Sequence, residues 1–108
     1  MKRANVYKND ILAGILTQHS RDRYTFVYDD TYYQNIAMPP VSLTLPKNQK
    51  EYKADHLLPF FFSMIAEGVN RSLQARQLKI DEEDYFSLLL ATAQSNTIGS
   101  VTLKEVEV

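Results

Sequence analysis

The apolar side chains of this chain change their spacing about half-way along the sequence, and that change limits the folds the chain can adopt. In the first half they favour strands, as in 24–28, where three aromatic side chains alternate with Thr25 and Val27 and share one strand face. In the second half they recur at helical spacing, as in 85–90. Strands followed by a separate group of helices are typical of an α+β domain.

The strands of the first half should form a meander. The polar pair Asn9-Asp10 is expected to be the turn of a hairpin between the first two strands. The predicted strands lie around Ala4 and Val6 and over 11–17, 24–28, 41–45 and 101–103. The segment 47–53 is polar and is predicted to be a surface loop. Because the early connections are too short for crossovers, we expect mainly antiparallel pairing.

Helix start and stop signals follow these strands. Asp29 and Asp30 should cap a short helical turn that runs to Ile36. A second helix is expected to begin near Pro59, because proline is tolerated only in a first turn, and to end at Ala66 or Glu67.

Three further positions set the remaining helix boundaries. Gly68 is expected to close the helix from Pro59 as a left-handed cap. Asn70 should cap a further helix and Asp81 the last one, from Glu82 to about Ala93, and both helices should lie on the sheet. At 108 residues the chain suits one domain, residues 1–108. We therefore predict a small, mainly antiparallel sheet of four or five strands with two or three helices packed on one face.

The stretch "LPFFFSMIAEGV" at 58–69 carries the densest apolar surface of the sequence. It contains about ten consecutive residues of apolar character, half of the roughly 20 needed for a membrane-spanning helix. Helical spacing groups Phe61 and Ile65 on one face, with Phe62 beside them, while Phe60 and Met64 point elsewhere. Either a neighbouring helix covers those side chains or they form a patch for a partner, and the sequence leaves both open.

Composition and motifs argue against several classes of function. A net charge of −1 lacks the positive field that nucleic-acid binding needs, and the absence of cysteine suits a reducing cytoplasm. No basic segment precedes an apolar one at the start, and no glycine-rich phosphate loop exists. His19 and His56 have no metal-binding neighbours in sequence. We expect the domain to have no enzymatic activity, to bind no cofactor or metal, and to contact neither nucleic acid nor a membrane directly.

Two residue groups offer alternatives to that negative result. The four carboxylates of 81–84 are read as a helix start, because consecutive residues point in different directions. The aromatic face of Tyr24, Phe26 and Tyr28 could stack single-stranded bases, but the charges beside it are mixed. A cross-strand aromatic ladder in the core is the favoured interpretation.

Five motifs, taken in order, resemble the N-terminal subdomain of HipA-type serine/threonine kinase toxins. They are "AGILT" at 13–17, "YTFVY" at 24–28, "PVSLTLP" at 40–46, "LPFFFSMIAEG" at 58–68, and "DYFSLLL" at 84–90 followed by "IGSVT" at 98–102. The sequence departs from the family pattern at Ala66, where proline is usual, at Val69, where a bulky aromatic is frequent, and at Ser100, where alanine is usual.

The resemblance implies a non-catalytic role. The ATP site and catalytic aspartates of HipA-like kinases lie in later parts of those proteins, which have no counterpart in these residues. Free-standing versions of the subdomain are known as HipS, one of the three parts of HipB–HipS–HipT toxin–antitoxin systems. The resemblance therefore implies a cytoplasmic, HipS-like antitoxin that binds and neutralises a separately encoded HipA/HipT-like kinase, with a helix-turn-helix, HipB-like protein as a further candidate partner.

If the domain binds such a kinase, its apolar helix should provide the anchor, because buried aromatic side chains within a polar rim carry most interface energy, and the turn after that helix should reach the kinase. The expected interface residues are Phe60, Met64, Glu67, Gly68, Val69, Asn70 and Arg71. Two alternatives stay open. The domain could be a structural subunit that completes an active HipA-like kinase, or an unrelated small-ligand-binding domain that uses the carboxylates of 81–84 or the tyrosine-rich face.

Overall fold

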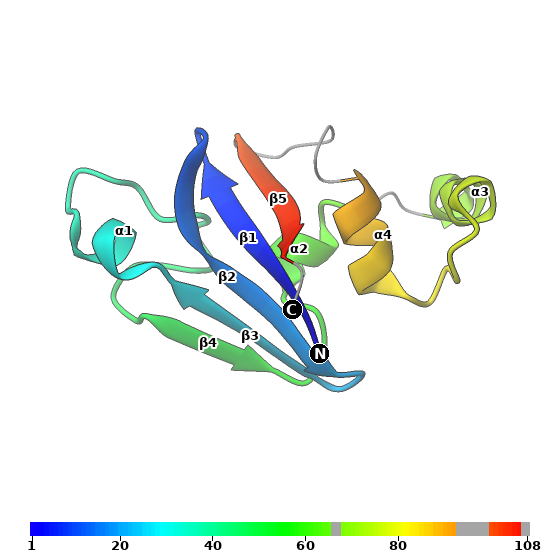
Figure 1. Ribbon diagram of the computed structural model, residues 1–108, viewed down its shortest axis with the longest axis horizontal. Helices are drawn as coiled ribbons and strands as arrows, with labels where there is room; N and C mark the ends of the chain where they lie inside the picture. The colour runs from blue at the N-terminus through cyan, green and yellow to red at the C-terminus, as the bar shows by residue number, and fades with distance from the viewer. Residues whose placement is uncertain (66–67, 93–99, 107–108) are drawn as a thin grey trace.

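The sheet organises the whole structure. A computed structural model describes residues 1–65, 68–92 and 100–106, and every structural statement below refers to these. Its five strands lie in the order β4-β3-β2-β1-β5, all antiparallel (Figure 1). Their bounds are β1 Lys2–Lys8, β2 Ile11–Ser20, β3 Arg23–Tyr28, β4 Glu51–Ala54 and β5 Val101–Val106. The helices are α1 Asp30–Gln34, α2 Pro59–Phe62, α3 Gly68–Leu78 and α4 Tyr85–Thr92. The predicted α+β class is confirmed.

The β1–β2 hairpin forms as predicted because its turn residues tolerate an unusual backbone. Asn9 and Asp10 have φ values of 52° and 66°, which place both in the left-handed region required by a two-residue hairpin turn. Asparagine and aspartate adopt this region more readily than other non-glycine residues. The pair Lys8 and Ile11 closes the turn.

One face of β3 anchors three helices. Tyr24, Phe26 and Tyr28 are all buried, which confirms the aromatic core predicted for this strand. Each ring meets a different helix: Tyr24 lies 6.3 Å from Phe86 of α4, Phe26 5.6 Å from Phe61 of α2, and Tyr28 6.0 Å from Tyr32 of α1. Three helices therefore contact the same face of the sheet.

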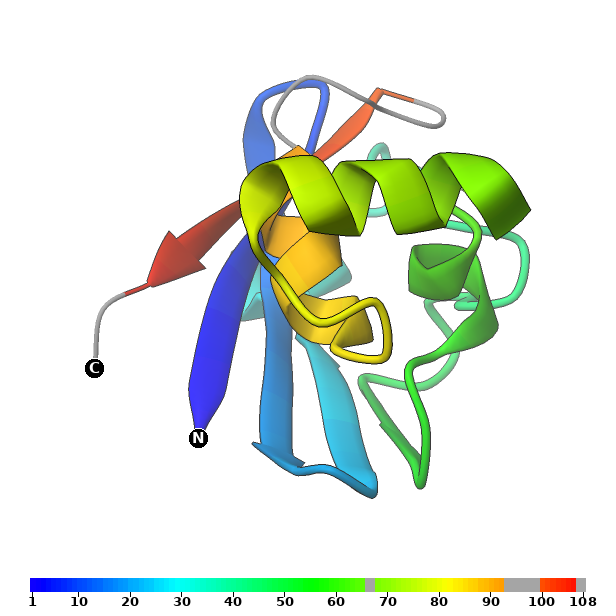
Figure 2. The same ribbon diagram turned by 90° about the vertical axis from the view of Figure 1, so that its right-hand side faces the viewer.

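Helix α3 does not lie on the sheet, contrary to the prediction. Figure 1 shows it at one end of the molecule beyond α4, and Figure 2 shows it in front of α2 and α4. Ala75 is its one buried residue among those whose side chains the structure describes, and Leu73 is 46% exposed. The sequence of α3 is mostly polar, so it offers no wide apolar stripe for a sheet to bury.

The prediction of a fourth strand at 41–45 is wrong. Residues 41–45 form a turn, in which the Leu45 amide donates to the Ser42 carbonyl over 3.0 Å. Val41 and Leu45 are buried, whereas Leu43 is 94% exposed. These residues have no partner strand in the described structure. The edge strand beside β3 is instead β4, Glu51–Ala54, which begins within the predicted loop 47–53.

Helix boundaries also differ from the prediction. Helix α2 begins at Pro59 as expected but ends at Phe62, and Gly68 opens α3 instead of closing α2. Asn70 lies inside α3, so it is not a cap. Helix α4 begins later than predicted because the carboxylate of Asp84, not that of Asp81, accepts from the first turn, at the Ser87 amide over 3.2 Å. Ala93 lies outside the described residues.

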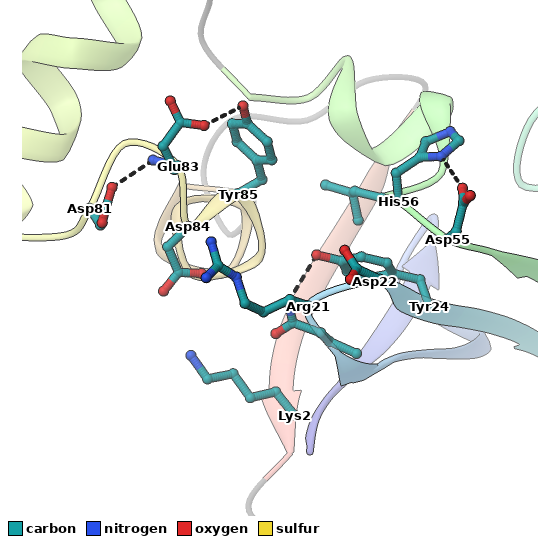
Figure 3. Close-up of a pocket in the computed structure, with 12 residues that line it drawn as sticks. Lys2, Arg21, Asp22, Tyr24, Asp55, His56, Asp81, Glu83, Asp84 and Tyr85 are labelled. Atoms are coloured by element: carbon teal, nitrogen blue, oxygen red, sulfur yellow. Dashed lines mark hydrogen bonds and ion pairs between the residues drawn. The ribbon is translucent and has the colours of Figure 1, made fainter.

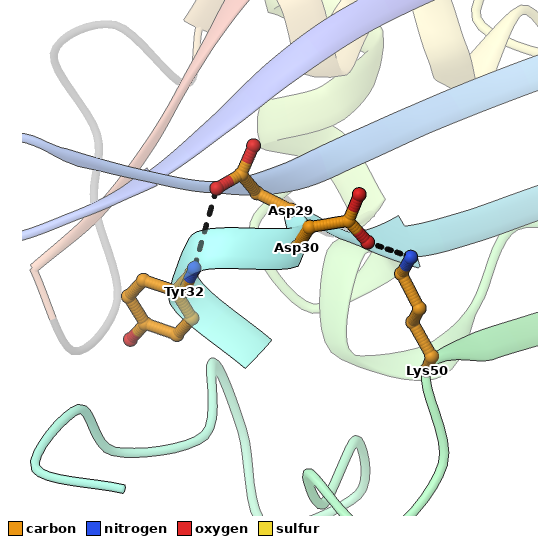
Figure 4. A network of polar contacts seen from close by, with 4 residues as sticks. All are labelled: Asp29, Asp30, Tyr32 and Lys50. Carbon is orange, nitrogen blue, oxygen red and sulfur yellow. Dashed lines mark hydrogen bonds and ion pairs between the residues drawn. The ribbon is translucent and has the colours of Figure 1, made fainter. Parts of the chain in front are cut away.

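The long connection from α1 to β4 is fastened at both ends. Asp29 caps α1 as predicted, accepting the Tyr32 amide at 3.2 Å, and the neighbouring Asp30 forms an ion pair with Lys50 (Figure 4). The helix ends at Gln34, before the predicted Ile36, which is 99% exposed. The ion pair holds the start of α1 against the residue that leads into β4.

The Tyr28 hydroxyl fixes the middle of the same connection. It accepts the Val41 amide at 3.0 Å and donates to the Leu45 carbonyl, so one buried oxygen bridges both ends of the turn. Tyr32 donates from its hydroxyl to the Pro39 carbonyl at 2.6 Å. Tyr28 therefore supplies, for Val41 and Leu45, polar partners that a neighbouring strand would otherwise provide.

Replacing Tyr28 by phenylalanine is expected to lower the free energy of unfolding by about 2 kcal/mol. The change leaves the Val41 amide and the Leu45 carbonyl without their buried partner, and such orphaned groups cost about 1–3 kcal/mol. Chemical denaturation followed by circular dichroism measures the loss. Tyr33→Phe is the control, because no hydrogen bond joins that hydroxyl to any described residue, and an equal loss in the control would contradict the account.

The same hydroxyl should make stability depend on alkaline pH. Burial raises the pKa of Tyr28 to about 12, above its usual value of 10.0. The unfolded chain therefore loses this proton first, so the contribution is present below pH 10 and is lost as the pH rises toward 12. Burial also raises the pKa of Tyr24 and of Tyr32. In Tyr28→Phe, the free energy of unfolding should therefore fall less steeply with rising pH, but it should still fall.

Among the described residues, no helix has the length and apolar character that crossing a membrane requires.

Candidate functional site

Helices α2, α3 and α4 meet around the ring of Tyr85, the first residue of α4. Phe62 of α2 packs edge-on against this ring with 5.1 Å between centroids. On α3, the guanidinium carbon of Arg71 lies 5.3 Å from the centroid of the same ring. We call Phe62, Arg71 and Tyr85 the Tyr85 corner. It joins three helices through a cation–π contact and an aromatic pair, and so gives α3 a fixed place.

Polar contacts support the Tyr85 corner from the loop before α4. The Tyr85 hydroxyl donates to Glu83 at 3.0 Å, and this hydrogen bond is the main cause that raises the pKa of Tyr85. Ser72 of α3 donates to Glu82. The acidic run that was predicted to begin a helix therefore also holds α3 in position.

The predicted interface residues are spread over this region. Phe60 is half-buried, with its ring 5.3 Å from that of Phe61. Met64 is 6% exposed and belongs to the core, which corrects the expectation that it points away from the buried face. Its thioether therefore offers little surface to a partner.

The remaining predicted interface residues lie on α3 or just before it. Asn70 is exposed and Arg71 is half-buried at the Tyr85 corner. Gly68 is the first residue of α3, while the Val69 side chain and all of Glu67 lie outside the described part of the structure. The structure thus brings Arg71 together with α2 and α4 and leaves Asn70 free on the same helix.

Sequence reasoning missed two residues of this region. Phe62 was grouped with the buried face of α2, but it is 36% exposed. Tyr85 was assigned to the apolar stripe of the last helix, but it is half-buried and joins α2 to α3. Helical spacing within one segment could not show this, because the contacts join residues that lie far apart in the chain.

A hollow opens between the β2–β3 turn, the start of β1 and the start of α4 (Figure 3). It has a volume of about 610 Å³ and mixes cations with carboxylates, among them Lys2, Arg21, Asp22 and Asp55. His56 is held by Asp55 at 2.6 Å, and Lys2 donates to Ser87 at 2.9 Å.

Asp81, Glu83 and Asp84 also line this hollow, but they do not converge as the ligands of a metal site would. Asp81 and Asp84 accept the amides of Glu83 and Ser87, and Figure 3 shows Asp81 and Glu83 on the side away from Asp22 and Asp55. In the described residues, no group of three or more histidine, aspartate or glutamate side chains is placed to hold a metal ion.

The fold and the order of its elements have counterparts among known proteins. Residues 4–104 match the family model of the HipA N-terminal domain. The chain belongs to the HipA N-terminal domain family. A Haemophilus influenzae protein, described only as an uncharacterized protein, is similar in sequence: it is 35% identical over 92 residues, which cover 85% of this chain and 81% of that one.

A solved structure gives the same relation in three dimensions. The N-terminal domain of HipA toxin matches with a TM-score of 0.73 and 28% sequence identity, over 99% of this chain and 94% of that one. The resemblance found in the five motifs is therefore confirmed for the HipA N-terminal domain. Through that domain the chain is related to HipA-type toxins.

Proposed function

We propose that this HipA N-terminal domain is a non-catalytic, HipS-like antitoxin that binds and neutralises a separately encoded HipA/HipT-like serine/threonine kinase in the cytoplasm. The observation that carries the proposal is the family match over residues 4–104, which spans every described helix and nearly all of the sheet. A helix-turn-helix, HipB-like protein is proposed as a third member of the complex.

The proposed kinase interface lies along α2 and α3. It comprises the exposed or half-exposed Phe60, Asn70 and Arg71, with Glu67, Gly68 and Val69 between them in sequence, and gains Phe62 from the structure. Aromatic and arginine side chains carry much of the energy of protein interfaces, especially where polar groups surround them. Met64 supports this surface from the core.

The domain would neutralise the kinase through the place at which it binds. The domain would dock where the N-terminal domain of a fused HipA-type kinase sits, and would hold the kinase inactive by covering its site or fixing a loop. The half-buried Arg71 suits such docking, because its guanidinium lies over the Tyr85 ring while part of the side chain stays exposed to a partner.

Co-expression with a HipA/HipT-like kinase from the same genome tests the proposal. We expect the kinase alone to arrest growth and the domain to restore it. If the kinase is harmless alone and arrests growth only with the domain, the domain completes an active kinase instead. If the domain changes growth in neither direction, both roles are excluded for that kinase.

A matched pair of double variants tests the interface. Phe62→Ser with Arg71→Ser should weaken kinase binding by about tenfold or more, since both lie at the Tyr85 corner. Leu78→Ser with Arg76→Ser removes the same classes of side chain near the far end of α3, where Leu78 is 44% exposed, and should change binding less than about twofold. Calorimetric titration gives both affinities, and equal effects would place the interface elsewhere.

A further inference from the structure

The face of the sheet that turns away from the three helices has its own regular chemistry. Two cross-strand rows run through all five strands on this face. From β4 to β5 they are Lys53, Thr25, Thr17, Arg3 and Val106, and Glu51, Val27, Ile15, Asn5 and Lys104. Residues directly opposite each other in antiparallel strands share a face, and these alternate with the core residues Ala4, Leu16 and Phe26. We call this surface the open face.

Part of the open face, on β1, β2 and β3, is apolar although it is not covered by α2, which Figure 1 shows behind the sheet. Ile15 is 40% exposed, and its row neighbour Val27 is half-buried. Tyr7 and Leu12 form a further half-buried pair on the same side, where Tyr7 accepts a hydrogen bond from Asn5 at 3.4 Å. The face is therefore polar over most of its two rows and apolar around Ile15, Val27 and the Tyr7–Leu12 pair.

The rim of the open face is basic. Lys53 and Lys104 lie on the two edge strands, Arg3 lies on β1, and Arg23 joins them by alternation with Thr25. Glu51 is the one acidic residue that the described strands place on this face, where Arg23 joins the three cations of the two rows, so these residues carry a net +3. The whole chain carries −1, which means that the rest of the molecule is acidic.

An apolar patch beside charged side chains is typical of a protein-binding surface, and the positive sign of those side chains favours an acidic partner. We propose that the open face docks a carboxylate-rich protein surface, and that this surface belongs to the kinase partner, as a contact additional to the interface proposed along α2 and α3. The choice of partner rests on the proposed function. Nucleic acid is a poorer match, because Tyr7 is the one aromatic side chain that the described strands place on this face, and no stacking platform forms.

Charge reversal on the open face tests this inference. Arg3→Glu with Lys104→Glu should weaken binding of the purified kinase by about tenfold or more, because both side chains are exposed rim cations. Arg76→Glu with Lys79→Glu, exposed cations on and just after α3, changes the net charge equally and should alter binding less than about twofold. Raising the salt from about 50 to about 300 mM should weaken the wild-type complex about fivefold. Melting curves check that each variant folds, and Lys53→Glu on the opposite edge provides a second rim variant.

The outcomes separate this inference from the proposed function. Binding that responds to salt and to the open-face reversal, but not to the control, supports the inference. Binding that ignores both salt and the reversal overturns the inference and leaves the proposed function standing. Failure of the wild-type domain to bind the kinase overturns the proposed function and this inference with it. Tight binding of a 20-nucleotide single-stranded probe, abolished by the same reversal, would reassign the face to nucleic acid and likewise overturn the inference.

Discussion

Replacing Phe61 by alanine is expected to lower the free energy of unfolding by about 3–5 kcal/mol, the range found for buried phenylalanine truncations. Phe61 is fully buried at 0% exposure and packs on Phe26 of β3, with Phe60 beside it. Truncation would leave a cavity between α2 and the centre of the sheet. Because small domains are stable by only about 5–15 kcal/mol, this loss would unfold a large share of the molecules at moderate denaturant.

Urea denaturation followed by circular dichroism measures the effect of Phe61→Ala. The neighbouring Phe62→Ala is the matched control, because Phe62 is 36% exposed and its truncation should cost about 1 kcal/mol. If both variants lost the same stability, the two adjacent phenylalanines could not differ in burial as the structure shows.

Replacing Gly14 by alanine is expected to cost about 2–3 kcal/mol. A Cβ atom at this position would lie 2.5 Å from the Val27 carbonyl oxygen and 2.8 Å from the edge of the Phe26 ring. The ring could turn, but the carbonyl belongs to the backbone of the paired strand β3 and cannot move without disturbing that pairing. Overpacking of this kind costs about 1–3 kcal/mol when the surroundings yield only in part.

A second variant shows which of the two contacts dominates at Gly14. Phe26→Leu removes the ring edge, so the double variant should recover only part of the loss that Gly14→Ala causes, since the carbonyl contact persists. Melting temperatures of the two single variants and the double variant measure this coupling. Full recovery would mean that the ring alone blocks the site, and an unchanged melting temperature for Gly14→Ala would contradict the close approach altogether.

The parts of the fold that sequence reasoning predicted are those set by local pattern. The β1–β2 turn at Asn9-Asp10, the buried aromatics of β3 and the start of α2 at Pro59 each depend on residues adjacent in the chain. The segment 41–45 has an equally good strand pattern and still forms a turn, because the hydroxyl of Tyr28 binds both of its ends. No spacing rule within 41–45 contains that information.

The same limit applies to the candidate site. The run of three phenylalanines raised the question whether it serves a core or a partner, and the structure divides it: Phe61 is buried, Phe60 is half-buried and Phe62 is 36% exposed. The contact of Phe62 with Tyr85 joins residues 62 and 85, and that of Arg71 joins α3 to the same ring. Residue patterns located the region, while the contacts that shape it depend on tertiary packing.

One titration tests the central claim most directly. Purified domain is added in steps to a fixed amount of the HipA/HipT-like kinase encoded in the same genome, and autophosphorylation of the kinase is measured at each step. A HipS-like antitoxin should reduce the activity to background at about one domain per kinase. Activity that rises with added domain, or that stays unchanged while the two proteins fail to bind, would contradict the claim.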